Sequence, residues 1–156
     1  MKVNIKKLVI SIAIPLLIGG ISALVSGGGM AAFGELNKPP LSPPGILFPI
    51  VWTILYVLMG ISSYLVFTSE EDDTIKLSAL LPYFLQLFFN FFWSIFFFKQ
   101  EWFYFSFIWL VVLWLLIIWN IIAFYQVNKK AANLLIPYLL WVTFAGYLNL
   151  AIAILN

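Results

Sequence analysis

Five long apolar runs, separated by turn residues and charged residues, make up most of this chain. Each run spans about 19–24 residues, enough for a helix rising about 1.5 Å per residue to cross a hydrocarbon core of roughly 30 Å. Every lysine, aspartate and glutamate falls outside the runs, and the runs lack the alternation of barrel strands. Because only helices and closed barrels span lipid, the pattern predicts an all-α membrane protein. We expect a single domain over residues 1–156, a bundle of five transmembrane helices at about 8–26, 49–67, 78–98, 102–125 and 134–155.

The composition also favours a membrane protein over a soluble one. Hydrophobic residues make up 64% of the 156 residues and charged residues 9%, with a mean hydropathy of +1.08. Soluble domains are near 45–50% apolar and about 25% charged, and a fold this small cannot hide the excess from water. The lipid bilayer is therefore an expected partner.

The N-terminal segment has two interpretations. Three lysines precede an apolar stretch and small residues near 22–29, which is also the pattern of a secretory signal. However, the apolar run is longer than a usual signal core, and four further spans follow it. We therefore interpret it as the first transmembrane helix.

The distribution of lysines predicts the orientation. One face of the membrane carries six lysines, whereas the other carries Lys38 and Lys99. Because cytoplasmic connections hold the excess of positive charge, we expect the N-terminus in the cytoplasm and Asn156 outside, in a bacterial cytoplasmic membrane. The cytoplasmic six are Lys2, Lys6, Lys7, Lys76, Lys129 and Lys130.

The first connection, from Gly27 to Phe48, is longer than the others. It contains four prolines within six residues, at 39–44, which fix φ repeatedly and stiffen the chain. A stiff segment of this length suits a lid better than a flexible linker. The predicted lid residues are Lys38, Pro39, Leu41, Pro43 and Pro44.

Several kinds of chemistry are excluded by residue types that the chain lacks, because it has no arginine, histidine or cysteine. The usual ligands of zinc, iron–sulfur clusters and haem iron are missing, as are His- and Cys-based nucleophiles. We expect no metal site and no required cofactor. The net charge of +2 gives no reason to expect a nucleic-acid partner. The absence of charge inside the spans argues against proton-coupled transport.

Polar side chains recur on one face of the third span. Gln86, Asn90 and Ser94 are four residues apart, so they stack on one side of the helix. Uncompensated amides are costly in lipid, so this face should point into the bundle. These residues either line a ligand cavity or only hold neighbouring helices together by hydrogen bonds.

Aromatic residues accompany this stripe on two other helices. Trp52 and Tyr56 lie one turn apart on the second span, where they fit either the bundle interior or an interfacial aromatic belt. Aromatic rings stack on planar apolar ligands, and amides orient their polar atoms. The sequence thus favours a cavity for a planar hydrophobic molecule. On the fifth span one face carries Tyr138, Trp141, Ala145 and Asn149.

The first span carries a groove of small residues. Gly19, Ala23 and Gly27 are spaced by four, so another helix backbone can approach this face closely. The groove could pack within the chain or between two subunits, and a homodimer is one possible assembly.

Three segments carry motifs in a fixed order. Residues 36–56 are similar to the pattern K-P-x-W-x-P-P followed by P-x-V-W-x-x-L-Y. Residues 86–94 are similar to Q-L-x-x-N-x-x-W-S, and residues 137–149 to P-Y-x-x-W-x-x-F-A-x-x-L-N. With these motifs the chain resembles, over nearly its whole length, the TspO/translocator protein family, also called tryptophan-rich sensory proteins or peripheral-type benzodiazepine receptors.

The resemblance implies a five-helix bundle, often dimeric, whose cavity beneath the first loop binds porphyrins and synthetic isoquinoline or benzodiazepine-type ligands. Some bacterial relatives are associated with light- and oxygen-dependent breakdown of protoporphyrin, which the resemblance would place on Trp52 and Trp141. Carried onto this chain, the ligand-binding residues are Phe48, Trp52, Tyr56, Gln86, Asn90, Trp141 and Ala145.

The chain departs from the family pattern in two ways. The lid tryptophan of the family is Leu41 here, and a Trp/Tyr pair preceding the lid is Ala32-Phe33, so one stacking surface for a porphyrin is missing. The proposed cholesterol pattern, L/V-x-Y-x-K/R, has no counterpart in residues 148–156. Sterol binding is therefore unsupported by motif.

Taken together, these features favour a membrane receptor or transporter that binds porphyrins and similar planar hydrophobic ligands in a cavity inside the bundle. Two alternatives remain. One is a photo-oxidative enzyme that degrades porphyrin, and the other is a structural membrane factor with a vestigial pocket.

Overall fold

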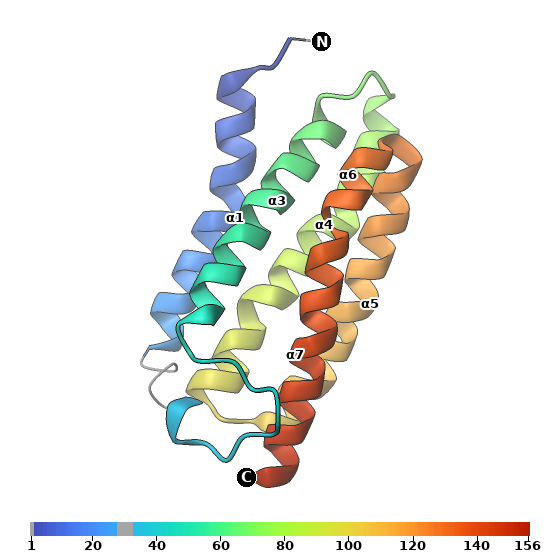
Figure 1. Cartoon of the computed structure of the whole chain (residues 1–156). Helices are drawn as coiled ribbons and strands as arrows, with labels where there is room; N and C mark the ends of the chain where they lie inside the picture. Colours follow the sequence, from blue (N-terminus) through green and yellow to red (C-terminus); the bar gives the residue numbers. More distant parts are fainter. Residues whose placement is uncertain (1, 28–32) are drawn as a thin grey trace.

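A computed structural model of the chain describes residues 2–27 and 33–156. Among these residues, five helical segments are long and apolar enough to cross a membrane. The segments run side by side, and the two chain ends lie at opposite ends of the bundle (Figure 1). The helices are α1 (Ile5–Ser26), α3 (Leu47–Phe67), α4 (Asp73–Ser94), which continues as the π-helix η1 (Ile95–Lys99), α5 (Phe103–Val127), α6 (Lys129–Leu134) and α7 (Ile136–Leu155).

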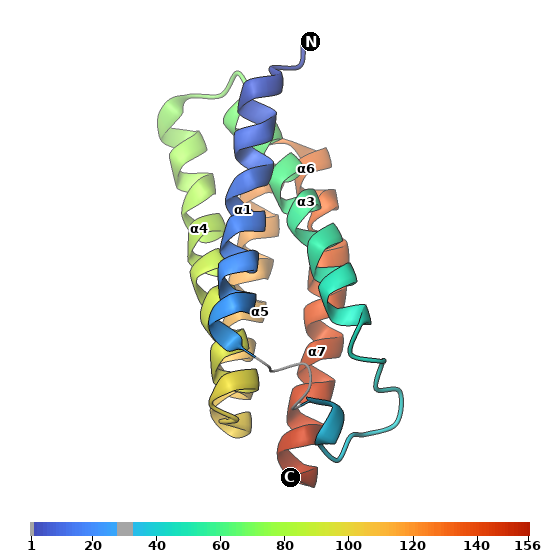
Figure 2. The same ribbon diagram turned by 90° about the vertical axis from the view of Figure 1, so that its left-hand side faces the viewer.

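The spans form a closed ring in which α1 packs on both α3 and α4, α4 on α5, and α5 on α7. The ring closes where α6, the first part of the fifth span, packs on α3. Figure 2 shows α1 lying in front of α3 and α4. Only 11% of the apolar window of α1 is buried, against 28–44% for the other four spans. The first span is therefore the least embedded wall of the bundle.

Several helices begin earlier than the apolar runs predicted. The helix expected at residue 8 starts at Ile5, because the Asn4 side chain accepts a hydrogen bond from the Lys7 N–H (3.1 Å) and caps it. The third span starts at Asp73 rather than residue 78. Hydropathy indicates only the part of a helix that lies in hydrocarbon, whereas capping residues determine where the helical backbone begins. The apolar runs therefore did not include the polar first turns of these helices.

The fifth span is broken near its start, which the apolar run did not show. Asn128 ends α5 and caps α6, because its side chain accepts from the Ala131 N–H (3.0 Å). The chain is therefore helical again from Lys129, five residues before the expected start. Leu135 separates α6 from α7, whose second residue is Pro137. Proline lacks an N–H and restricts the residue before it, so a new helix begins there.

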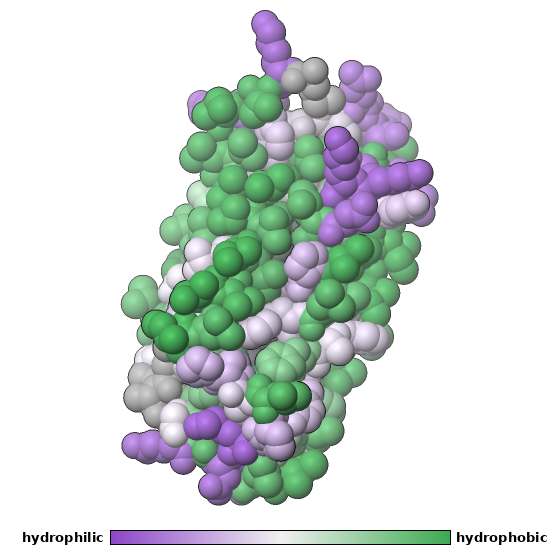
Figure 3. Space-filling model, viewed as in Figure 1, coloured by the Kyte–Doolittle hydropathy of each residue, from purple (hydrophilic) through white to green (hydrophobic). Residues whose placement is uncertain are grey.

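The outer surface of the bundle is apolar over its middle and hydrophilic toward its two ends (Figure 3). Large exposed hydrophobic side chains include Phe84 and Phe88 of α4 and Ile108 and Leu115 of α5. In water such a surface would be an aggregation hazard, but in a bilayer it contacts lipid. The chain is therefore an integral membrane protein.

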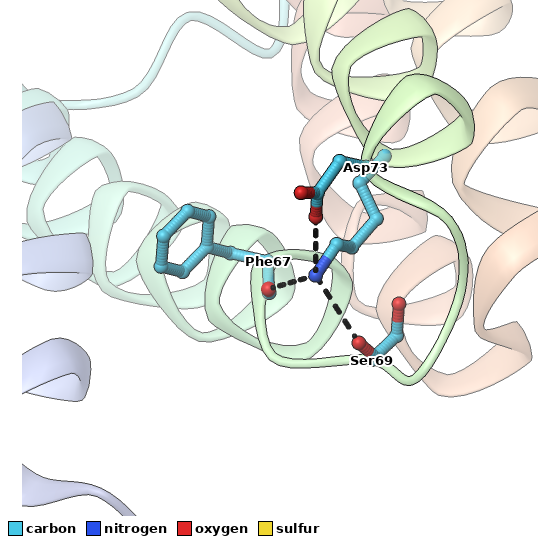
Figure 4. Close-up of polar contacts among 4 residues, drawn as sticks. Phe67, Ser69 and Asp73 are labelled. Atoms are coloured by element: carbon cyan, nitrogen blue, oxygen red, sulfur yellow. Dashed lines mark hydrogen bonds and ion pairs between the residues drawn. The ribbon is translucent and has the colours of Figure 1, made fainter.

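Lys76 binds three residues around the connection between α3 and α4, and these partners, Phe67, Ser69 and Asp73, are labelled in Figure 4. Its Nζ donates to the carbonyl oxygens of Phe67 (3.1 Å) and Ser69 (3.3 Å) and lies 3.6 Å from Asp73 Oδ1. A cation beside the last carbonyls of a helix satisfies acceptors that have no helical donor. This contact helps hold the ends of α3 and α4 together.

The proline-rich segment is tied to the end of α7. The Tyr147 hydroxyl donates to the Pro40 carbonyl (2.8 Å), and the Asn156 amide donates to the Asn37 carbonyl (2.9 Å). Leu41 has a φ of 71° and is 82% exposed, so its side chain points away from the protein. Ala32, where the family pattern is interrupted, lies outside the described residues together with Gly28 and Gly29.

Candidate functional site

A cavity of about 260 Å³ lies between α1, α3 and the third span, and we call it the α1/α3/α4 cavity. One wall is aromatic, one consists of small residues of α1, and the third is formed around the junction of α4 and η1. The cavity wall includes Gly19, Gly20, Ala23 and Ser26 of α1, Phe48, Trp52, Thr53 and Tyr56 of α3, and Ser94 and Phe98 of the third span.

The aromatic wall follows from the spacing along α3. Phe48, Trp52 and Tyr56 recur every four residues and therefore share a face. The Trp52 and Tyr56 rings are stacked, with centroids 5.6 Å apart and an interplanar angle of 27°. The Trp52 ring also lies 6.4 Å from that of Trp93 on α4. These contacts hold a flat aromatic surface at the cavity wall.

The small-residue groove of the first span packs within the chain. A Cβ atom on Gly19 would overlap the Tyr56 ring, so only glycine allows this approach of α1 to α3. Ala23 and Gly27 line the cavity. The sequence left open whether this groove packs within the chain or between two subunits. At these positions it packs within the chain.

A hydrogen-bonded network beside the cavity joins three helices. The Tyr56 hydroxyl donates to Asn90 Oδ1 (2.9 Å), and Asn90 Nδ2 donates to the Tyr138 hydroxyl (2.7 Å). Tyr138 in turn donates to Gln86 Oε1 (2.7 Å). All four side chains are buried. The three residues of the polar stripe on the third span therefore have different roles. Gln86 and Asn90 form hydrogen bonds with tyrosine hydroxyls of other helices, whereas Ser94 lines the cavity.

The two predicted site residues of α7 lie elsewhere. Trp141 borders an apolar groove of about 410 Å³ between α3 and α7. Its indole nitrogen is buried and has no hydrogen-bond partner within the described residues. Ala145 is buried in a small hollow beside Phe48 and Asn149. The structure therefore brings Phe48, Trp52 and Tyr56 together at one cavity, whose wall includes neither Trp141 nor Ala145. Phe48 links the two regions, because its ring lies edge-to-face against that of Trp141, with centroids 5.9 Å apart, and it also borders the hollow of Ala145.

The predicted lid residues contribute no side chain to the cavity wall. Sequence reasoning also missed Thr53 and Phe98, which do line it. Phe98 lies four residues after Ser94 and extends the spacing of the stripe by one step. Its apolar side chain does not stand out within a span rich in phenylalanine, so the sequence gives no signal that singles it out.

Among the described residues, no charged side chain lines the α1/α3/α4 cavity. Lys38 is engaged elsewhere, since its Nζ donates to the carbonyl oxygens of Phe33 (3.2 Å) and Gly34 (3.0 Å). Among the described residues there is also no cluster of His, Cys, Asp or Glu that could hold a metal ion. The site can therefore act through ring stacking, shape and hydroxyl groups.

Comparisons with known proteins agree with this architecture. The chain matches the TspO/MBR family over residues 11–155. It is 36% identical over 154 residues to the tryptophan-rich protein TspO of Archaeoglobus fulgidus, covering 98% of this chain and 99% of that protein. It is 37% identical over 125 residues to the tryptophan-rich protein TspO of Chlorobaculum tepidum, covering 80% of this chain and 78% of that protein.

The similarity extends to animals. The human translocator protein is 35% identical over 131 residues, covering 82% of this chain and 76% of that protein. The family match covers nearly the whole chain, and these relatives are more than 30% identical along most of their length. Together they establish the family of this chain. The chain belongs to the TspO/MBR family and is a membrane receptor or transporter of the TspO kind.

Proposed function

We propose that this protein binds planar hydrophobic ligands, porphyrins among them, in the α1/α3/α4 cavity. The observation that carries the proposal is the stacked pair of Trp52 and Tyr56 at the cavity wall. Flat rings offset-stack on other flat rings, and each aromatic pair contributes about 0.5–1.5 kcal/mol beyond its buried area. Phe48 and Phe98 add further ring surface to the same wall.

The size of the cavity adds a requirement. Its volume of about 260 Å³ is just below the roughly 300–1,000 Å³ of pockets that hold drug-sized ligands. A porphyrin therefore needs a wider cavity than the one described. The wall that can move is α1, because it is the least buried span and faces the cavity with glycine and alanine.

The test is an equilibrium titration of the purified protein with protoporphyrin, followed by the Soret absorption band. Trp52→Phe removes ring area at the cavity wall and should weaken binding about five- to tenfold, equivalent to roughly 1–1.4 kcal/mol. Trp119→Phe is the matched control, because Trp119 is 44% exposed on the outer face of α5. Equal effects of the two variants, or no binding by the unmodified protein, would refute the proposal.

A further inference from the structure

The hydroxyl groups that line the α1/α3/α4 cavity differ in whether they already donate a hydrogen bond within the protein. The Ser26 hydroxyl donates to the Ser22 carbonyl (2.7 Å), and the Thr53 hydroxyl donates to the Pro49 carbonyl (2.7 Å). The Tyr56 hydroxyl donates to Asn90 Oδ1 (2.9 Å). A hydroxyl has one proton to donate. These three groups therefore offer a ligand only acceptor lone pairs.

Ser94 differs from these three residues. Its hydroxyl lines the cavity and makes no hydrogen bond with the described residues 2–27 and 33–156. It lies at the point where α4 passes into the π-helix η1, a kind of helix distortion that is frequent at functional sites. Within the described wall, Ser94 is thus the hydroxyl whose proton is free for a ligand. The Trp52 indole N–H is a second donor of this wall without a hydrogen-bond partner among the described residues.

Charge adds a second restriction. None of the described side chains that line the cavity is a lysine or an arginine, and Lys99, one residue beyond Phe98, is exposed. An ionised carboxylate that leaves water without a cationic partner loses its hydration without compensation. An uncharged acceptor such as an ester or ketone carbonyl loses much less and can still accept from a hydroxyl.

We propose that the α1/α3/α4 cavity selects uncharged planar ligands over their carboxylate forms, and that the Ser94 hydroxyl donates a hydrogen bond that orients them. The preferred ligand is a flat hydrophobic ring system that carries a neutral acceptor, such as a carbonyl group. This inference rests on the proposed function, because it names the class of ligand that the same cavity takes.

The first test compares two probes that share one ring system but differ in charge, protoporphyrin and its dimethyl ester, at pH 7 in nanodiscs of uncharged lipid. Because the ester also partitions more strongly into lipid, binding is counted as the difference between the unmodified protein and Gly20→Leu. A Cβ on Gly20 meets no atom within 4 Å, so leucine can occupy the cavity without a backbone clash. We expect the ester to bind at least tenfold more tightly. Equal or tighter binding of the diacid would overturn the inference.

The second test concerns the donor. Ser94→Ala should weaken binding of the ester about three- to tenfold, the range of one neutral hydrogen bond. It should leave thermal unfolding of the ligand-free protein unchanged, because the Ser94 hydroxyl has no partner among the described residues. Ser78→Ala is the control, since Ser78 is exposed on the same helix. Unchanged affinity in Ser94→Ala would remove Ser94 from the role.

The outcomes separate this inference from the proposed function. If neither probe binds the unmodified protein more than Gly20→Leu, the proposed function itself fails. If both probes bind equally in excess of that variant, the cavity binds porphyrins but the selection for uncharged ligands is wrong.

Discussion

The Tyr138 hydroxyl on α7 lies 2.7 Å from Asn90 Nδ2 and 2.7 Å from Gln86 Oε1, both on α4. It accepts from the first and donates to the second. Since Asn90 also accepts from Tyr56 on α3, one hydroxyl holds a network that joins three helices at the same depth. The sequence indicated the polar face of Gln86 and Asn90, but only the structure shows that these amides bond to Tyr56 and Tyr138 beside the aromatic wall of the cavity.

Replacing Tyr138 by phenylalanine should destabilise the protein, because it leaves the Asn90 amide and the Gln86 oxygen buried without this partner. The expected cost is about 1–2 kcal/mol, since hydrogen bonds between helices in membranes are worth little more. Thermal unfolding in detergent measures it. Tyr104→Phe serves as the control because Tyr104 is 60% exposed, and a network role is wrong if the two variants unfold alike.

Adjacent glycines of α1 should respond differently to the same change. Gly19→Ala places a methyl group against the Tyr56 ring and should destabilise by about 1–3 kcal/mol through overpacking. Gly20→Ala meets open space and should be neutral or slightly stabilising, because alanine favours helix more than glycine does. Unfolding temperatures of both variants test this, and equal effects would contradict the described packing of α1 on α3.

Trp141→Phe should change porphyrin affinity by less than about threefold, or roughly 0.7 kcal/mol, because Trp141 borders the α3/α7 groove and not the α1/α3/α4 cavity. The family resemblance instead assigned Trp141 to the ligand. Soret titration of Trp141→Phe beside Trp52→Phe distinguishes the two positions. A larger loss in Trp141→Phe than in Trp52→Phe would place the ligand between α3 and α7.

Leu41→Trp restores the residue type of the family's lid and should leave porphyrin affinity unchanged. The Leu41 side chain is 82% exposed, and the segment around it is tied to α7 by Tyr147. Titration of the variant with protoporphyrin provides the measurement. A gain in affinity would show that the segment closes over the ligand, as the sequence predicted.

The orientation can be tested because the chain has no native cysteine. Gln100→Cys lies at the end of the bundle expected outside, and Glu70→Cys lies at the opposite end; both positions are exposed. In intact cells a membrane-impermeant maleimide should label Gln100→Cys, and it should label Glu70→Cys only after lysis. The reverse pattern would place the N-terminus outside, against the lysine distribution.

Much of the fold could be read from the sequence for a simple reason. Lipid penalises unpaired backbone groups and charges so strongly that apolar length alone defines the five spans. Periodicity also indicated correctly that Gln86 and Asn90 face the interior, where both are buried. Helix ends were less predictable, because a single side chain such as Asn4 or Asn128 sets them by capping.

The site needed the tertiary structure. A helical period identifies a face but not its neighbours, so it could not tell that Asn90 is taken up by Tyr56 and Tyr138 while Ser94 remains free at the cavity. It could not tell either that Trp141 borders a different hollow from Trp52. Composition and periodicity determined that this chain is a five-span membrane bundle with an aromatic and amide interior. The packing of the helices alone decided which of those side chains bond to one another and which face empty space, because that depends on distances between segments far apart in the sequence.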